Sequence, residues 1–164
     1  MSHSSSITRT TPARQEFFDV TDEVVELVRS SEVSRGIVLA YTPHTSCCVL
    51  LQEESEDTTY FGTQLILQDT LNVLARIAPP VRHEGQYLHP GPIHVKNAAD
   101  LRDELPEWGL NTDGHILSSI LGRSESIPIV DGEPLLGEFG RVYFGDLDSV
   151  RSRTRTIHLQ IVGG

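Results

Sequence analysis

Three histidines, each in a short polar motif beside an apolar run, are the residues of this sequence whose types and surroundings most suggest chemistry. They are His44 in Tyr-Thr-Pro-His-Thr-Ser, His83 in Val-Arg-His-Glu and His115 in Asn-Thr-Asp-Gly-His. Neutral imidazole is the commonest metal ligand in proteins and moves protons readily near pH 7. The motifs therefore predict a catalytic or metal-binding site if the fold brings them together.

An acidic cluster and an alternating arginine series are further candidates. The acids at positions 52–57 either complement the dipole of a following helix, or include a general base or a group that orients a histidine, for which Glu53 is the candidate. Arg151, Arg153 and Arg155 alternate, so in an extended segment they share one face. That face is either an anion-binding patch or a solvated edge.

The composition is that of an ordinary globular protein of one domain. The chain has 164 residues, of which 38% are hydrophobic and 22% charged. Its net charge of -10 argues against a nucleic-acid partner, because phosphate backbones are bound by basic surfaces. Twelve of the thirteen basic residues are arginine, which grips phosphate through a planar fork, although a genomic bias would give the same count.

Local composition predicts where the domain begins and which cellular compartment the protein occupies. Residues 1–13 are Ser/Thr-rich and lack the apolar centre of a signal peptide, so we expect a disordered tail followed by a single domain over 14–164. No segment approaches 18 consecutive apolar residues, which predicts no membrane partner. Cys47 and Cys48 are adjacent in an apolar run and indicate a reduced, cytoplasmic protein.

Helices and strands are predicted from hydrophobic periodicity and from turn residues. Helices are expected from Thr21 to before Gly36, from Asp57 or Thr58 to Ala78, as a turn within Ala98–Leu105, and from His115 to Gly122. Strands are expected over Arg14–Val20, Gly36–Tyr41, Ser46–Leu51, Ile127–Val130, Arg141–Leu147 and Thr154–Val162.

The last predicted strand shows the clearest alternation. Ile157, Leu159 and Ile161 face one way, while His158 and Gln160 face the other, as in an antiparallel sheet with one solvated face. The order of elements predicts either an α+β domain or a two-layer β-sandwich with helices outside. The irregular stretch from Val81 to Asn111 is long enough to be functional or mobile.

Taken together, these motifs resemble the YjbQ-type family, whose members are described as secondary thiamine-phosphate synthases. These motifs occur in the order expected for the family and together cover most of residues 15–162. The matching segments are Tyr-Thr-Pro-His-Thr-Ser-Cys-Cys (41–48), the acidic stretch 52–57, Arg-His-Glu (82–84), Gly-His-Ile-Leu-Ser-Ser-Ile-Leu-Gly (114–122), Asp-Gly-Glu-Pro-Leu-Leu-Gly (131–137) and Arg-Thr-Ile-His-Leu-Gln-Ile-Val (155–162).

The resemblance implies a fold, an assembly and an activity. The fold is α+β, mainly an antiparallel β-sandwich with helices packed outside, assembled as a homotrimer with sites near subunit interfaces. The implied activity joins a pyrimidine diphosphate to a thiazole phosphate and releases pyrophosphate.

Roles for individual residues also come from the resemblance. The metal ligands would be His44, His83 and His115, around a divalent ion for which zinc is favoured, or around a bound anion. His44, Glu53 and His115 would be catalytic. A small phosphorylated substrate would be bound by Thr45, Ser46, Arg141 and Arg153.

Two departures from the family pattern bear on the substrate. Leu-Gly-Glu-Phe-Gly stands at 136–140 where family members often carry Leu-Gly-Thr-Trp-Gln. The segment 84–112 is longer than in compact members, and we expect it to act as a lid or to reshape the pocket. Two other functions stay open: a metal-dependent hydrolase of a phosphate or ester, and a non-catalytic trimer that binds an anion or a partner protein.

Overall fold

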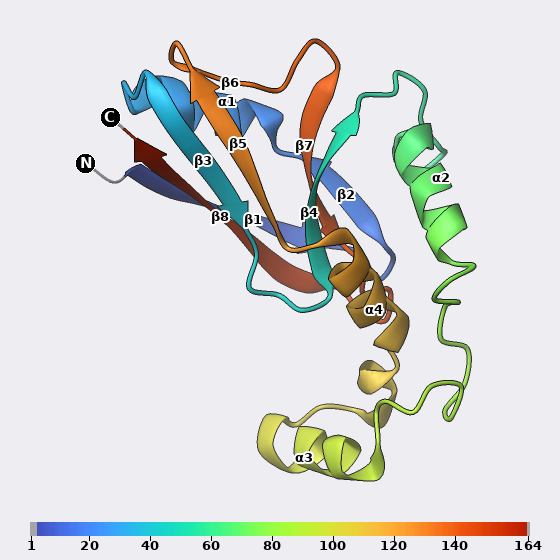
Figure 1. The fold of residues 1–164 in the computed structure, drawn as a ribbon. Helices are drawn as coiled ribbons and strands as arrows, with labels where there is room; N and C mark the ends of the chain where they lie inside the picture. The colour runs from blue at the N-terminus through green and yellow to red at the C-terminus, as the bar shows by residue number, and fades with distance from the viewer. Residues whose placement is uncertain (1–2, 164) are drawn as a thin grey trace.

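The computed structural model describes residues 3–163, which form two antiparallel sheets (Figure 1). The five-stranded sheet contains, in spatial order, β1 (His3–Thr11), β8 (Arg153–Gly163), β3 (Arg35–Tyr41), β5 (Ser124–Val130) and β6 (Glu133–Pro134). The three-stranded sheet contains, in spatial order, β2 (Glu16–Asp19), β7 (Gly140–Asp146) and β4 (Cys47–Glu53). The predicted α+β class with mainly antiparallel sheets is confirmed.

The main core lies between the sheets and follows the alternation of the strands. In β8, Ile157, Leu159 and Ile161 are buried while His158 and Gln160 are exposed, as predicted. The same core receives side chains from β4, β7 and the helix α1 (Thr21–Ser30). Because one face of β8 is buried, a slip of one residue in its pairing would turn its apolar side chains to solvent, so the register is strongly specified.

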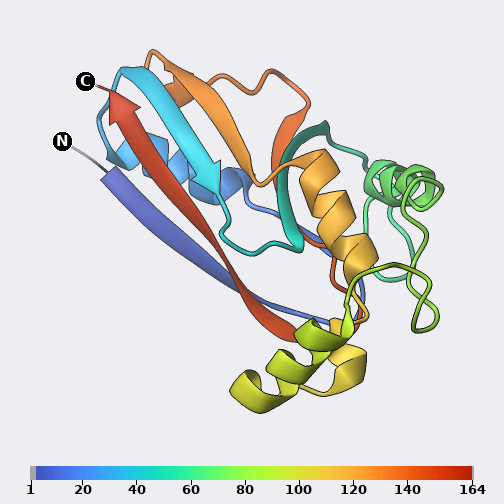
Figure 2. The same ribbon diagram turned by 60° about the horizontal axis from the view of Figure 1, so that its bottom comes forward.

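Helices cover the other face of the three-stranded sheet, which is therefore buried on both sides. α2 (Leu65–Leu74) and α4 (Thr112–Leu121) pack there (Figure 2) around a second apolar cluster that includes Cys48, Leu117 and Tyr143. Burial on both faces explains why the sequence of β4 is continuously apolar at its start instead of alternating.

The segment predicted as a disordered tail differs most from expectation. Residues His3–Thr11 form strand β1, which pairs with β8 along its whole length. The prediction was wrong because Ser and Thr dominate this segment and give no apolar alternation. The strand is formed by backbone hydrogen bonds to β8, which lies far along the chain. Ile7 and Thr11 are the side chains that anchor the strand, since both are buried.

Two helix predictions also need correction. The long helix expected from Asp57 or Thr58 begins only at Leu65, because residues 58–64 form a turn closed by a bridge between Thr58 and Gln64. The helix near His115 begins at Thr112, and it ends as predicted at Gly122, whose φ of 91° favours glycine.

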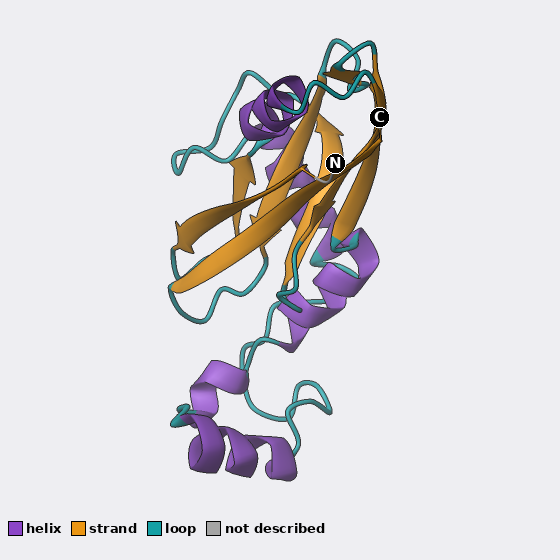
Figure 3. Ribbon diagram, turned by 90° about the vertical axis from the view of Figure 1, so that its left-hand side faces the viewer, coloured by secondary structure: helices purple, strands orange, loops and turns teal. Residues whose placement is uncertain are grey.

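The long segment before α4 forms a projection that we call the arm (residues 84–110). It contains α3 (Pro92–Arg102) and a short 3₁₀ helix, η1 (Pro106–Gly109). The arm extends beyond α4, away from the sheets (Figures 1 and 3), and Ala98 is the buried residue of α3. Within residues 3–163, no helix is both long and apolar enough to cross a membrane.

Candidate functional site

A buried network of acids and arginines joins the end of β7 to the start of β8. Asp146 and Asp148 are fully buried, and Arg155 is 6% exposed. Arg155 donates from Nε to Asp146 Oδ2 (3.1 Å) and from a terminal nitrogen to Ser46 Oγ (2.9 Å). Thr11 donates to the same oxygen of Asp146 at 2.7 Å. Buried charges require such partners, because removing them from water is otherwise very costly.

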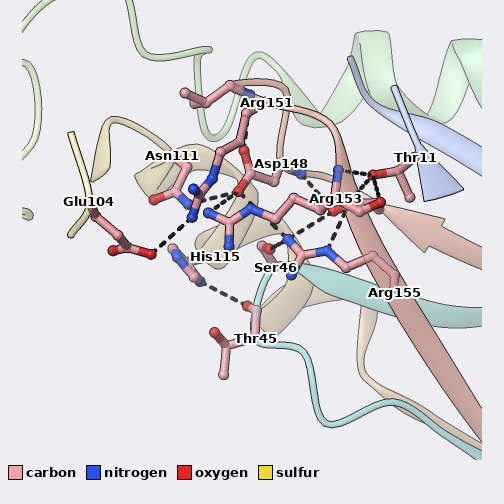
Figure 4. Close-up of polar contacts among 12 residues, drawn as sticks. Thr11, Thr45, Ser46, Glu104, Asn111, His115, Asp148, Arg151, Arg153 and Arg155 are labelled. Atoms are coloured by element: carbon pink, nitrogen blue, oxygen red, sulfur yellow. Dashed lines mark hydrogen bonds and ion pairs between the residues drawn. The ribbon is translucent and has the colours of Figure 1, made fainter. Parts of the chain in front are cut away.

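Asp148 extends this network toward the surface (Figure 4). It accepts a hydrogen bond from Asn111 Nδ2 at 2.9 Å, and its Oδ2 lies 3.3 Å from Arg153 and 3.6 Å from Arg155. Arg153 and Arg155 thus share one face of β8, as their alternation predicts. The burial of Arg155 rules out the solvated-edge interpretation for that residue.

The third arginine of the series holds the arm. Arg151 pairs with Glu104 at 2.9 Å (Figure 4), and its guanidinium lies 3.9 Å from the centre of the Trp108 ring. Burial raises the pKa of the Glu104 carboxyl, but hydrogen bonds from Arg102 and Arg151 outweigh this effect, so the net pKa is lowered. The anionic form of Glu104 is therefore favoured. Its ion pair with Arg151, whose guanidinium stacks on Trp108, holds the arm against the segment that precedes β8.

A cavity of about 390 Å³ opens between this network and the arm. Three arginines and two carboxylates line it. Each arginine has a carboxylate partner, which is Glu104 for Arg102, Asp148 for Arg153 and Asp146 for Arg155. Its lining residues are Pro43, His44, Thr45, Ser46, His94, Arg102, Glu104, Trp108, Gly109, Asn111, His115, Asp148, Arg153 and Arg155. Arginine forks next to hydroxyl and imidazole groups suit a phosphate or carboxylate ligand.

The hydrogen bond of His115 assigns its tautomer. Its Nδ1 lies 3.0 Å from the backbone carbonyl oxygen of Thr45 (Figure 4). A carbonyl oxygen can only accept, so Nδ1 carries a proton. The other ring nitrogen, Nε2, then holds a lone pair in the neutral ring and a second N–H in the protonated ring. His115 can therefore accept a proton or donate one to an oxyanion.

The structure brings together five of the predicted site residues and separates three. His44, Thr45, Ser46, His115 and Arg153 line the cavity. The strand register explains the separation of Glu53 and Arg141: Cys47 pairs with Asp146 at the cavity end of β4 and β7, and Glu53 pairs with Gly140 at the other end. Six residues of strand make this roughly 20 Å.

The separated residues do not line the cavity and have other partners. Arg141 forms an ion pair with Glu54 and does not reach the cavity. His83 lies exposed in a bend after α2, where its Nδ1 contacts the carbonyl oxygen of Glu84 at 3.1 Å. The departure at 136–140 also lies at the end of β7 remote from the cavity.

The three predicted metal ligands do not converge within one chain. His83 stands apart, and the Nε2 of His44 already accepts a hydrogen bond from the backbone N–H of Thr156 at 3.0 Å. Among residues 3–163, no three His, Cys, Asp or Glu side chains are arranged to hold a metal. Within one chain, the zinc set His44, His83 and His115 is therefore not assembled, although His44 and His115 share the cavity.

Several cavity residues were missed in the sequence. Asp148, which lines the cavity, follows Asp146, the last residue of β7, by two positions. Two alternating acids at the end of an apolar strand were a signal that the sequence offered. Glu104 lies in the long irregular segment, where no periodicity marks it, and His94 and Trp108 of the same segment also line the cavity. Their contribution supports the expectation that this long segment reshapes the pocket.

His44 leads to a prediction about the dependence of stability on pH. Burial, followed by the positive charge of Arg155, lowers the pKa of this imidazole. The unfolded chain then binds a proton at a higher pH than the folded protein, so the contribution to stability is complete above about pH 6.5 and is lost as the pH falls below it. Urea unfolding between pH 7.5 and 5.5 should show declining stability.

The matched variant is His44→Gln, which keeps a polar side chain without a titrating ring. We expect a shallower decline in this variant, with the remainder coming from His89, whose pKa is lowered by burial and by His94 and His115. Identical pH profiles for the two proteins would contradict the role of His44.

The fold and the site define an α+β protein with a buried acid–arginine network and an arginine-lined cavity at one end of its sheets. The chain belongs to the UPF0047 protein YjbQ-like family, whose family model matches residues 5–164. This confirms the resemblance inferred from the motifs.

Relatives and solved structures agree with this assignment. A UPF0047 protein of Archaeoglobus fulgidus is 29% identical over 90% of this chain and 93% of its own length, and one of Methanocaldococcus jannaschii is 27% identical over 93% and 89%. A YbjQ-like protein of unknown function from Sulfolobus solfataricus P2 has the same fold, with a TM-score of 0.76, 22% identity, and coverage of 100% of this chain and 99% of its own.

Proposed function

We propose that this protein is an enzyme that binds a small phosphorylated substrate in the arginine-lined cavity. The observation that carries the proposal is the convergence of Arg102, Arg153 and Arg155 with His115 around one cavity in an otherwise acidic chain. Such a site attracts phosphate groups and stabilises charge that develops on them.

The reaction we favour is the one implied by the resemblance. The carbon–oxygen bond of a pyrimidine methyl diphosphate breaks, and its electron pair leaves with pyrophosphate. The thiazole nitrogen forms the new carbon–nitrogen bond, which gives thiamine phosphate. This displacement needs positive charge at the leaving group more than it needs a protein nucleophile.

We assign each of these cavity residues one role in such a step. Arg153 and Arg102 would hold the diphosphate, and protonated His115 would donate its Nε2–H to the leaving oxygen. Asp148 would keep Arg153 in position through their ion pair. No step is assigned to a metal ion, since the predicted ligands do not meet.

The assay supplies both thiamine precursors and measures thiamine phosphate and pyrophosphate. We expect turnover by the wild type and at least a tenfold loss in kcat/KM for Arg153→Ala and for His115→Ala. Arg35→Ala is the charge-matched control, because Arg35 is exposed at the opposite end of the five-stranded sheet.

Binding of inorganic pyrophosphate, measured by calorimetry, separates the site from the reaction. Arg153→Ala should weaken this binding by about tenfold, and Arg35→Ala should not change it. Absence of product with retained pyrophosphate binding would overturn the transferase and leave an anion-binding protein. Unchanged binding in Arg153→Ala would overturn the cavity as the anion site.

We also propose that the chain assembles as a homotrimer. Apolar side chains stand on the outer face of the five-stranded sheet, where Ile37 and Val162 pair across β3 and β8 and are 47% and 65% exposed. Covering such a face is favourable. Light scattering should give the mass of three chains, and a monomer would contradict the assembly.

A further inference from the structure

Strand β1 forms an open edge of the five-stranded sheet (Figure 2). It pairs with β8 in one continuous register, from His3 opposite Ile161 to Thr11 opposite Arg153. Soluble proteins usually protect an edge strand by keeping it short, by a bulge, or by lysine or proline on the edge. β1 is nine residues long and has no bulge, lysine or proline, so its free side is open to a further strand.

The backbone of β1 presents hydrogen-bonding groups on that free side. Thr156 of β8 donates its N–H to His44 Nε2 at 3.0 Å, and its carbonyl oxygen accepts from Thr42 Oγ1 at 2.8 Å, so both groups point to the β3 side. Thr8 lies opposite Thr156 and therefore points its own N–H and C=O away from β8. The same direction repeats at every second residue of the strand, which adds Ser4, Ser6 and Thr10.

The helix α1 lies beside this edge and forms a groove with it. The groove has a volume of about 670 Å³ and is lined by residues 5–9 of β1. On the helix side it is lined by Asp22, Glu23, Glu26, Leu27 and Ser30. An edge strand next to a helix is a geometry in which extended peptides add to a sheet, with affinity from the backbone and selectivity from side-chain pockets.

The side chains of the groove favour a basic ligand. Glu23 pairs with Arg9, which is the only lysine or arginine that lines the groove. Asp22 and Glu26 are exposed one helical turn apart, and neither has an ion-pair partner in the part of the chain that the structure describes. Leu27 is half-buried and offers an apolar contact. Lysine or arginine side chains flanking an apolar one would complement this surface.

A second copy of this chain fits the groove less well than a basic peptide. If two β1 strands paired, each would bring Arg9 as its only lysine or arginine, and Arg9 already pairs with Glu23 of its own chain. The two α1 helices would also lie on the same side of the joined sheet, so their acids would face like charges, which is unfavourable.

We propose that the groove between β1 and α1 binds an extended basic segment of a partner protein, which adds to the sheet as a strand beside β1. Alternate side chains of the segment face the groove, where an apolar one covers Leu27 and basic ones pair with Asp22 and Glu26. This site is separate from the arginine-lined cavity, because no residue lines both.

The test measures fluorescence anisotropy of a labelled peptide, Lys-Thr-Val-Thr-Lys-Thr, with the full-length protein. We expect saturable binding, and no binding of the peptide in which glutamate replaces both lysines. Asp22→Asn/Glu26→Gln should bind the lysine peptide at least tenfold more weakly. Asp69→Asn/Glu56→Gln is the charge-matched control, because it removes two exposed acids that lie outside the groove, and it should bind as the wild type does.

Methylation of the peptide backbone separates strand addition from charge attraction alone. Only one edge of an added strand meets β1, so methylating one alternate set of peptide nitrogens should abolish binding and methylating the other set should change it little. Equal effects of the two sets would overturn strand addition. Failure of the unmethylated peptide to bind, or full binding by Asp22→Asn/Glu26→Gln, would overturn the groove as the site. A smaller mass of Thr8→Pro in light scattering, without peptide binding, would assign the edge to a second copy instead.

Discussion

Replacing Asp146 with alanine is expected to lower the free energy of unfolding by about 3–5 kcal/mol, because it leaves Arg155 buried without its main counter-charge. Asp146 is fully buried and accepts hydrogen bonds from Arg155 and Thr11. It thereby connects β7 to β8 and to the N-terminal strand. Urea unfolding gives the free energy, and thermal unfolding should show a fall in Tm of roughly 10 °C.

An exposed ion pair supplies the control for this prediction. Arg29 and Glu133 lie 2.9 Å apart with side chains 61% and 52% exposed, so Glu133→Ala should cost no more than about 1 kcal/mol. The double variant Asp146→Ala/Arg155→Met should be more stable than Asp146→Ala alone, because it removes the unpaired charge. Equal effects of Asp146→Ala and Glu133→Ala would show that the network does not support the fold.

Gly114→Ala is expected to destabilise the protein by about 2 kcal/mol and to weaken pyrophosphate binding. Alanine is the better helix former by about 1 kcal/mol, so propensity alone predicts the opposite sign. However, a Cβ at this position would lie 2.7 Å from the backbone oxygen of Leu147. α4 must then move away from the segment that carries Asp148, and His115 moves with it, at an overpacking cost of about 1–3 kcal/mol.

A second glycine tests the cause of that effect. Gly91 precedes α3 with a φ of -82°, and a Cβ there would meet no atom within 4 Å. Gly91→Ala should therefore leave both stability and pyrophosphate affinity close to wild type. If Gly114→Ala proved stabilising, the close approach of α4 to Leu147 would be contradicted.

The sequence by itself determined much of the sheet architecture, because strand patterns are local. The alternation in 157–161 identified both β8 and its buried face, and the continuous apolar run at 47–50 identified a strand covered on both sides. Predictions from local composition were wrong where pairing with a distant strand decides the structure. The Ser/Thr-rich start of the chain is a strand only because β8 lies beside it.

For the site, the sequence determined candidate residues but not their grouping. His44, His115 and Arg153 were identified from their motifs and spacing, and the fold places all three around one cavity. Strand register and topology decide which end of a strand faces that cavity. Glu53 therefore lies away from it, although it ends the same strand that Ser46 precedes.

Only the tertiary structure decided the partners of the arginines. Asp148 lies close to Arg153 in the sequence, but Glu104 reaches Arg151 from the arm, 47 residues away. The physical reason is that a buried charge takes whatever counter-charge the packing of distant elements supplies, and a single sequence carries no record of that packing. The histidines of the motifs therefore indicated that a site exists, while packing decided that it is lined by arginines.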